Sequence, residues 1–285
     1  MKPIITAVEL KDILHQKNLV VLDARTGKNA SEDYLHKHLL NARFVDLDKD
    51  LANIGEDAAF GGRHPLPTLE KFKKTIQNLG ISENSHVVVY DTSNGANAAA
   101  RCWWMLKSFG LEKVQVLSGG LQAAEKEGIT MTLLQAQGDK AENFDKTTIL
   151  LGEYWRLPIS TLEEVEKGIA ESNTTVIDVR DAYRFRGESE PIDLVAGHIP
   201  GAINIPFSEN LDTSGEFLPP ETLKEKYGGF LKGRSQNLII HCGSGVTACH
   251  TILALEYAGY PTPNLYVGSW SEWSRREGKE IAKEI

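Results

Sequence analysis

The chain repeats one series of short segments in its two halves, and this internal repeat restricts the possible folds more than any other feature of the sequence. The segments TAVE (residues 6–9) and TLEE (residues 161–164) each place a threonine ahead of a glutamate with capping-box spacing, which indicates a helix start. The apolar segments VVLDAR (residues 20–25) and VIDVR (residues 176–180) come next and predict short buried strands. The strands are separated by the same distance along the chain as the helix starts.

Further matched segments continue the repeat. In chain order, the pairs are residues 38–42 with 198–202, 87–91 with 238–242, and 114–120 with 264–270. The resulting order of helix, strand, loop, strand, helix, strand and helix is typical of parallel strands connected by crossover helices. We therefore predict an α/β fold of two tandem domains, at residues 1–138 and 157–285, each a small parallel sheet flanked by helices. Residues 139–156 are expected to form the linker.

Length and charge agree with this plan and exclude some functions. A chain of 285 residues has the length of two ordinary domains. Its net charge of -8 argues against nucleic acid or an anionic membrane as partner. No apolar stretch approaches the roughly 20 residues that span a bilayer. Acidic residues occupy the place of a signal peptide's apolar stretch, and three cysteines make no disulfide framework, so we expect a cytoplasmic protein.

The most informative segment is LIIHCGSGVTACH, residues 238–250. An apolar strand ends at Cys242, two glycines then alternate with small residues, and a helical pattern starts near Thr247. Glycines permit a tight turn that directs successive backbone N–H groups inward, and the helix start adds partial positive charge. We expect Cys242 to be a thiolate at neutral pH and therefore a sulfur nucleophile.

Cys242 has two alternative interpretations, a buried structural cysteine and a metal ligand. A packing cysteine does not need a Gly-Ser-Gly turn, and core positions suit Cys102 and Cys249 better because both lie in helical stretches away from the turn. His241 and His250 add to a cluster of possible ligands. Neighbouring strand residues point to opposite faces, however, and the spacing does not resemble a chelating pair. We predict no metal site.

The first half of the chain has lost the cysteine. Asp91 stands at the position that corresponds to Cys242, and Thr-Ser-Asn-Gly follows it. A carboxylate cannot hold transferable sulfur. We predict that the N-terminal domain is a catalytically silent copy.

These motifs resemble those of the two-domain sulfurtransferases of the rhodanese superfamily, above all the mercaptopyruvate sulfurtransferases. The loop from Cys242 to Ala248 is the most specific match, and the resemblance covers nearly the whole chain. The segments GHIPG (residues 197–201), AINIP (202–206) and GSWSEW (268–273) are similar too. The resemblance implies two tandem rhodanese-like domains and a Cys242 persulfide. The persulfide sulfur comes from a small-molecule donor and passes to a thiol, thioredoxin or cyanide, without a metal or organic cofactor.

The resemblance also bears on the donor. Thiosulfate-preferring relatives place cationic side chains directly after the cysteine, whereas this sequence has Gly243 and Ser244, as mercaptopyruvate enzymes do. We therefore expect 3-mercaptopyruvate as donor, with thiosulfate as the alternative. The backbone N–H groups of Gly243, Gly245, Val246 and Thr247 are implied to hold the charged sulfur, as preorganised donors do in oxyanion sites.

Three polar residues are implied to act on the substrate. Ser244 matches a hydroxyl that the family uses together with a histidine and an aspartate. The histidine matches His64, and Asp50 is the nearest candidate for the aspartate.

One arginine is implied to bind the donor's carboxylate. Arg184 matches it, and a guanidinium suits bidentate capture of a carboxylate. A second arginine of the family pattern falls within residues 188–193, where this sequence has none. Arg186 or Arg63 would then take its place.

Two other functions compete with sulfur transfer. A cysteine phosphatase needs a longer loop that ends in an arginine, and Ala248 stands where that arginine would be. A non-catalytic sulfur carrier or regulatory binding module is disfavoured by the intact Cys242 loop.

Overall fold

The computed structural model describes residues 1–133, 152–235 and 237–284, which form two compact units. The N-terminal unit comprises Met1–Ala52, Pro67–Arg156 and Thr213–Glu216, and the C-terminal unit comprises Asn53–Leu66, Leu157–Asp212 and Phe217–Ile285. Of the linker expected at residues 139–156, the part up to residue 151 lies outside the described residues. The units do not follow the halves of the chain, because residues 53–66 belong to the C-terminal unit.

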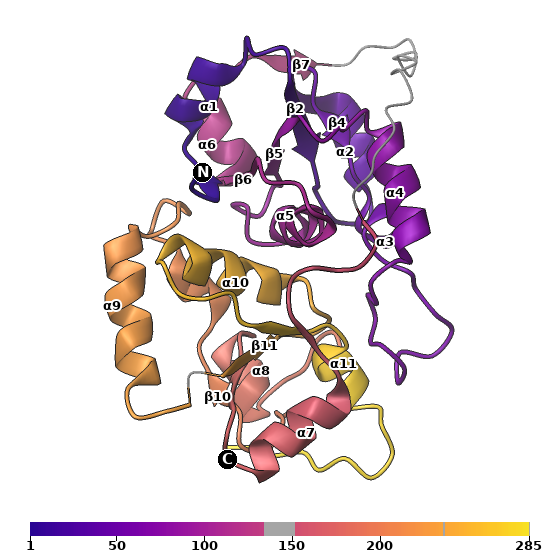
Figure 1. The fold of residues 1–285 in the computed structure, drawn as a ribbon, viewed down its shortest axis with the longest axis vertical. Helices are drawn as coiled ribbons and strands as arrows, with labels where there is room; N and C mark the ends of the chain where they lie inside the picture. The colour runs from indigo at the N-terminus through magenta and orange to yellow at the C-terminus, as the bar shows by residue number, and fades with distance from the viewer. Residues whose placement is uncertain (134–151, 236, 285) are drawn as a thin grey trace. The chain divides into compact units, whose positions relative to one another are not determined.

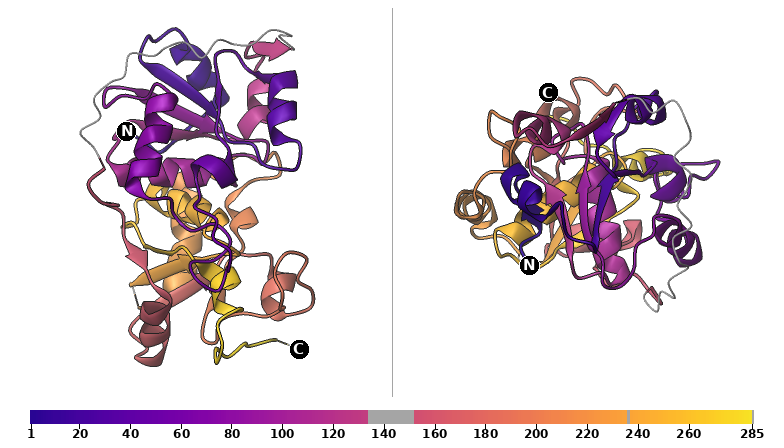
Figure 2. Two further views of the ribbon diagram at one scale, coloured as in Figure 1. Left: turned by 90° about the vertical axis from the view of Figure 1, so that its right-hand side faces the viewer. Right: turned by 90° about the horizontal axis from the view of Figure 1, so that it is seen from above.

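The N-terminal unit contains a five-stranded parallel sheet in the order β1-β6-β5-β2-β4 (Figure 1). Its strands are β1 (Ile4–Ile5), β2 (Leu19–Asp23), β4 (Arg43–Phe44), β5 (His86–Tyr90) and β6 (Val114–Leu117). Helices lie on both faces of the sheet (Figure 2): α1 (Ala7–Ile13), α2 (Ala30–His36), α3 (Leu47–Asp50), α4 (Leu69–Asn78), α5 (Ala98–Phe109) and α6 (Gly120–Lys126). Strands β3 (Lys37–Leu39) and β7 (Met131–Leu133) form a separate antiparallel pair.

The C-terminal unit repeats this plan with the strand order β10-β9-β11-β12-β8. Its strands are β8 (Ile159–Ser160), β9 (Thr175–Asp178), β10 (Ile203–Asn204), β11 (Leu238–His241) and β12 (Asn264–Tyr266), all parallel. Its helices are α7 (Leu162–Ala170), α8 (Ala182–Arg186), the 3-10 turn η1 (Phe207–Asn210), α9 (Pro220–Leu231), α10 (Thr247–Tyr257) and α11 (Ser269–Trp273). Matching each strand with its repeat partner gives the same order in both units, which confirms the predicted α/β fold.

Both helix starts predicted from capping boxes are formed. In α1, the Thr6 hydroxyl accepts the Glu9 N–H at 3.3 Å and the Glu9 carboxylate accepts the Thr6 N–H at 2.9 Å. In α7, Thr161 and Glu164 make the same pair of bonds at 3.3 and 2.8 Å. These reciprocal bonds satisfy N–H groups that a helix start leaves unpaired, so the local sequence is sufficient to begin both helices here.

The central strand of each sheet leads into a buried helix. Strand β5 is buried along its whole length and precedes α5, and β11 is equally buried and precedes α10. Cys102 in α5 is 1% exposed and Cys249 in α10 is 0% exposed, as predicted for core residues. Among the described residues, no helix combines the length and apolar character that crossing a bilayer requires.

A buried aspartate–arginine pair lies at the end of the second strand, in chain order, of each sheet. Arg25 binds Asp23 with 2.6 Å between Nη2 and Oδ2, and Arg180 binds Asp178 at the same distance. Burial alone would raise the pKa of the Asp178 carboxyl, but the adjacent Arg180 cation holds that pKa below its ordinary value. The pair recurs in both units and therefore serves the fold.

Asp23→Asn should lower the free energy of unfolding by about 3–5 kcal/mol, since the Arg25 guanidinium would stay buried without an anion. Urea denaturation monitored by circular dichroism measures this. Asp12→Asn on the exposed side of α1 is the matched control and should change the value little. Equal stability of the two variants would contradict a structural role for the pair.

Candidate active site

Cys242 lies at the carboxyl end of the central strand β11, immediately before the turn into α10. Its N–H donates to the Ser269 hydroxyl at 3.2 Å, and its carbonyl accepts the Trp270 N–H at 3.0 Å. The residue is only 2% exposed. A reactant therefore has to enter the loop to reach the sulfur, and Cys242 is less accessible than the sequence alone suggested.

The loop after Cys242 depends on glycine at one point. Gly245 has a φ of +73°, and a Cβ atom there would lie 2.6 Å from the Val267 carbonyl oxygen. No side chain fits this position, so the chain can turn here only with glycine. In the described part of the chain, no hydrogen bond occupies the backbone N–H groups of Gly243, Ser244 and Val246. These donors, together with Thr247 as first residue of α10, remain available to an anion.

The structure brings together Ser244 and His64, the pair that the family resemblance implied. His64 Nδ1 lies 2.7 Å from Ser244 Oγ, although the two residues lie far apart along the chain. Ser244 is buried and His64 is half-buried. A hydroxyl with a hydrogen-bonded imidazole is an arrangement that can move a proton.

His64 is positioned by the segment 53–66, which is fastened to α11. The Gly61 N–H donates to Glu272 Oε1 at 2.9 Å, and the Arg63 N–H donates to Ser271 Oγ at 3.0 Å. Gly62 adopts a φ of +78°, and a Cβ atom there would lie 2.3 Å from the Gly268 carbonyl oxygen. This close backbone contact explains why residues 53–66 belong to the C-terminal unit.

Arg184 on α8 faces the same loop. Its Nη2 atom is 2.7 Å from Glu190 Oε1 and would be 3.6 Å from a Cβ placed on Gly243. Burial tends to lower the pKa of Arg184, but Glu190, Asp193 and Cys242 together raise it above its ordinary value. Arg184 is thus a fixed cation beside the cysteine loop.

Asp193 and Arg275 belong to this site, and the sequence analysis missed both roles. The Asp193 side chain is 0% exposed and accepts from Arg63 Nε at 3.0 Å and Arg275 Nη1 at 2.9 Å. Nothing local marks Asp193 as an arginine acceptor, because its partners come from distant parts of the chain.

Two other predicted residues, Arg186 and Asp50, have described partners outside the Cys242 loop. Arg186 is exposed and pairs with Glu188 at 2.6 Å, and no contact with the Cys242 loop is found for it in the described residues. Asp50 belongs to the N-terminal unit, where its carboxylate accepts the Asp46 N–H at 2.9 Å. The pairing of Asp50 with His64 stays a prediction.

The matching loop of the N-terminal unit shows what this type of turn can bind. The buried Asp91 carboxylate, at the end of β5, accepts four backbone N–H groups. The donors are Ser93 at 2.8 Å, Gly95 at 2.8 Å, Asn97 at 3.0 Å and Ala99 at 3.1 Å. Burial raises the pKa of Asp91, and these donors oppose the rise. The loop that follows Asp91 is therefore a turn that binds an anion.

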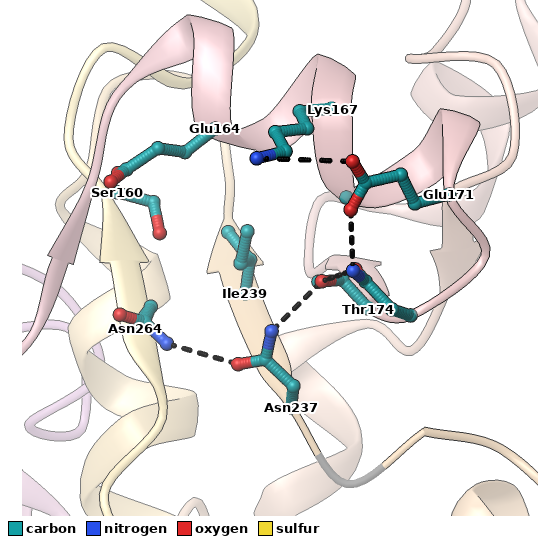
Figure 3. A pocket seen from close by; sticks show the side chains of 10 residues that line it. Ser160, Glu164, Lys167, Glu171, Thr174, Asn237, Ile239 and Asn264 are labelled. Carbon is teal, nitrogen blue, oxygen red and sulfur yellow. Dashed lines mark hydrogen bonds and ion pairs between the residues drawn. The ribbon is translucent and has the colours of Figure 1, made fainter.

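A polar pocket lies at the amino ends of β11 and β12 in the C-terminal sheet (Figure 3). Asn237, just before β11, and Asn264, at the start of β12, line it together with Lys167 of α7 and Glu171, the residue that follows this helix. Cys242 follows the other end of β11, so this pocket is separate from the cysteine loop. In the described ranges, no three His, Cys, Asp or Glu side chains are grouped as metal ligands.

Fold and site together define a protein of two tandem parallel-sheet α/β domains with one cysteine-centred loop. The family model of the rhodanese-like domain matches residues 6–127 and again residues 161–276. The chain therefore belongs to the rhodanese-like family, and both halves carry the domain.

Similar proteins support this assignment. A Pseudomonas aeruginosa protein named "Probable 3-mercaptopyruvate sulfurtransferase" is 39% identical, with 98% of this chain and 97% of that protein covered. The thiosulfate sulfurtransferase of Gallus gallus is 34% identical, with 90% and 87% covered. The structure of 3-mercaptopyruvate sulfurtransferase from Leishmania major matches with a TM-score of 0.82 and 28% identity, over 96% of this chain and 74% of that one. The resemblance inferred from the motifs is confirmed.

Proposed function

We propose that the protein is a sulfurtransferase in which Cys242 carries sulfur as a persulfide between a small-molecule donor and a thiol acceptor. The observation that carries this proposal is the pair of matching loops. One holds a carboxylate with four backbone N–H groups, and the other has a cysteine at the same position with N–H groups left available. A persulfide anion is the group that such a loop would stabilise on a cysteine.

In the first half-reaction, the Cys242 thiolate attacks the sulfur of 3-mercaptopyruvate. A new S–S bond forms while the bond between C3 and sulfur breaks, and its electron pair passes to C3. The resulting enolate takes up the proton that the donor thiol gives up, so pyruvate leaves and a Cys242 persulfide anion remains. Ser244, bonded to His64 at 2.7 Å, is the group we assign to relay that proton.

In the second half-reaction, the acceptor thiolate attacks the outer sulfur of the persulfide. The S–S bond of the persulfide breaks, the Cys242 thiolate returns, and the acceptor leaves with the sulfur. A small thiol, reduced thioredoxin or cyanide fits this chemistry. All three cysteines are free thiols, which agrees with a reducing compartment such as the cytoplasm.

The donor assignment rests on the charge beside the loop. Arg184 is a buried cation near Gly243, and a guanidinium suits the carboxylate of an α-keto acid. Ser244 and His64 add a proton relay that thiosulfate would not need. The thiosulfate alternative stands because the Gallus gallus relative carries that name.

Intact mass measurement tests the proposal. After incubation with 3-mercaptopyruvate, the protein should gain one sulfur, about 32 Da, and should lose it again on addition of a thiol acceptor. Because Cys242 is 2% exposed, iodoacetamide should modify it more slowly than a small free thiol at the same pH. No mass gain with either mercaptopyruvate or thiosulfate would favour the non-catalytic binding module. A higher kcat/KM with thiosulfate would overturn the donor assignment alone.

Arg184→Ala should raise KM for 3-mercaptopyruvate by about 10- to 150-fold, since about 1.5–3 kcal/mol of charged hydrogen bonding is lost. Arg186→Ala is the matched control, because Arg186 lies on the same helix but is exposed and pairs with Glu188. Steady-state kinetics on both variants measure the effect. Similar KM values for the two variants would remove Arg184 from donor binding.

A further inference from the structure

Three arginines converge on the single carboxylate of Asp193. Arg63 approaches with Nε at 3.0 Å and Nη2 at 3.4 Å, Arg275 with Nη1 at 2.9 Å, and Arg184 with Nη2 at 3.7 Å. The Asp193 side chain is completely buried, whereas the Arg63 and Arg275 side chains keep 26% and 16% of their surface exposed. Asp193 therefore sets the position of cations that solutes can still reach.

These groups belong to a larger chain of ion pairs. Arg184 is shared between Asp193 and Glu190, and Arg180 is shared between Glu190 and Asp178. The connected groups are the arginines 63, 180, 184 and 275 and the carboxylates of Asp178, Glu190 and Asp193. Cations exceed anions by one charge, and the Cys242 thiolate or persulfide would neutralise that excess.

The cluster reaches the cysteine loop itself. A Cβ atom built on Gly243, the residue after Cys242, would lie 3.0 Å from Arg63 Nη2, 3.6 Å from Arg184 Nη2 and 3.6 Å from Asp193 Oδ2. The Asp193 charge is thus as close to the entry of the loop as the charge of Arg184. At such distances a buried carboxylate strongly disfavours a second nearby anion.

We propose that Asp193 determines donor specificity by limiting the positive charge that the site offers. A donor with a single negative charge, such as an α-keto acid with a neutral thiol, then fits, whereas a dianion such as thiosulfate is disfavoured. Asp193 also holds Arg63 beside the loop as a second carboxylate-binding residue. This inference rests on the proposed function, because it concerns the donor that loads Cys242.

Asp193→Asn tests the charge directly. The ratio of kcat/KM for thiosulfate to kcat/KM for 3-mercaptopyruvate should rise by about tenfold or more, because one anion beside the loop is removed. Asp193→Glu keeps the charge and should keep the ratio close to wild type. Glu188→Gln removes one charge from the exposed surface of the same segment and is the matched control. An unchanged ratio in Asp193→Asn, or an equal rise in Glu188→Gln, overturns the inference.

A measurement on the wild-type protein covers the case in which Asp193→Asn does not fold. Pyruvate, a monoanion, should protect Cys242 from iodoacetamide at lower concentrations than sulfate, a dianion. Equal or better protection by sulfate overturns the inference. The proposed function fails in a different way, by absence of a sulfur adduct on wild-type Cys242 with every donor, so the two failures are distinguishable.

Discussion

Cys242→Ser will abolish persulfide formation and reduce sulfur transfer by about 10⁴-fold or more, because a serine hydroxyl is not ionised at neutral pH and cannot carry sulfane sulfur. Intact mass after treatment with 3-mercaptopyruvate should remain unchanged, and pyruvate release should fall to the uncatalysed rate. The Cys242 N–H and carbonyl bonds to Ser269 and Trp270 do not involve the sulfur, so the fold should persist.

Cys249→Ser is the control for that experiment. Cys249 is also buried near the loop, and its sulfur lies 3.3 Å from the Gly245 carbonyl oxygen. The Cys249→Ser variant should still load sulfur on Cys242, because Cys249 lies inside α10 rather than at the strand end. Retention of the adduct in Cys242→Ser, or its loss only in Cys249→Ser, would move the nucleophile to the other residue.

Ser244→Ala and His64→Asn should each lower kcat for 3-mercaptopyruvate by about 10²–10³-fold, since each removes one half of the 2.7 Å hydroxyl–imidazole pair. Loading of Cys242 from thiosulfate, which needs no proton on carbon, should fall much less. Kinetics with both donors measure this difference.

The double variant separates a relay from two independent effects. When two residues act as one unit, replacing both lowers kcat no further than replacing either one alone. The kcat of the double variant Ser244→Ala with His64→Asn should therefore match that of the single variants. Fully multiplicative losses, or equal losses with both donors, would show that the pair only supports the loop.

The fold was largely predictable because its signals are local. Capping boxes at Thr6 and Thr161 depend on residues within one turn, and the apolar strands that end at Asp91 and Cys242 are recognisable as short runs. Because of the internal repeat, each element could be predicted from two segments of the chain. The loop of Cys242 was predictable for the same reason, because strand, glycine turn and helix are consecutive in the chain.

The rest of the site depends on contacts between distant residues. Asp193 receives Arg63 and Arg275, and no spacing rule connects these positions. The suggestion that Arg186 assists Arg184 has a geometric weakness. Residues two apart on a helix point in nearly opposite directions, so only one of them can face the loop. Likewise, the attachment of residues 53–66 to α11 depends on the close backbone contact at Gly62.

The Asp91 carboxylate at the end of β5 makes the two duplicated loops different in what their backbone N–H groups bind. The Asp91 carboxylate is part of the chain and cannot dissociate, so the four backbone N–H donors of its turn keep the same acceptor at every stage of turnover. In the proposed reaction, the corresponding turn around Cys242 gains and gives up its bound sulfur in each catalytic cycle. The anion that occupies the Asp91 turn is thus part of the protein chain, whereas the turn at Cys242 is proposed to exchange its sulfur with small molecules.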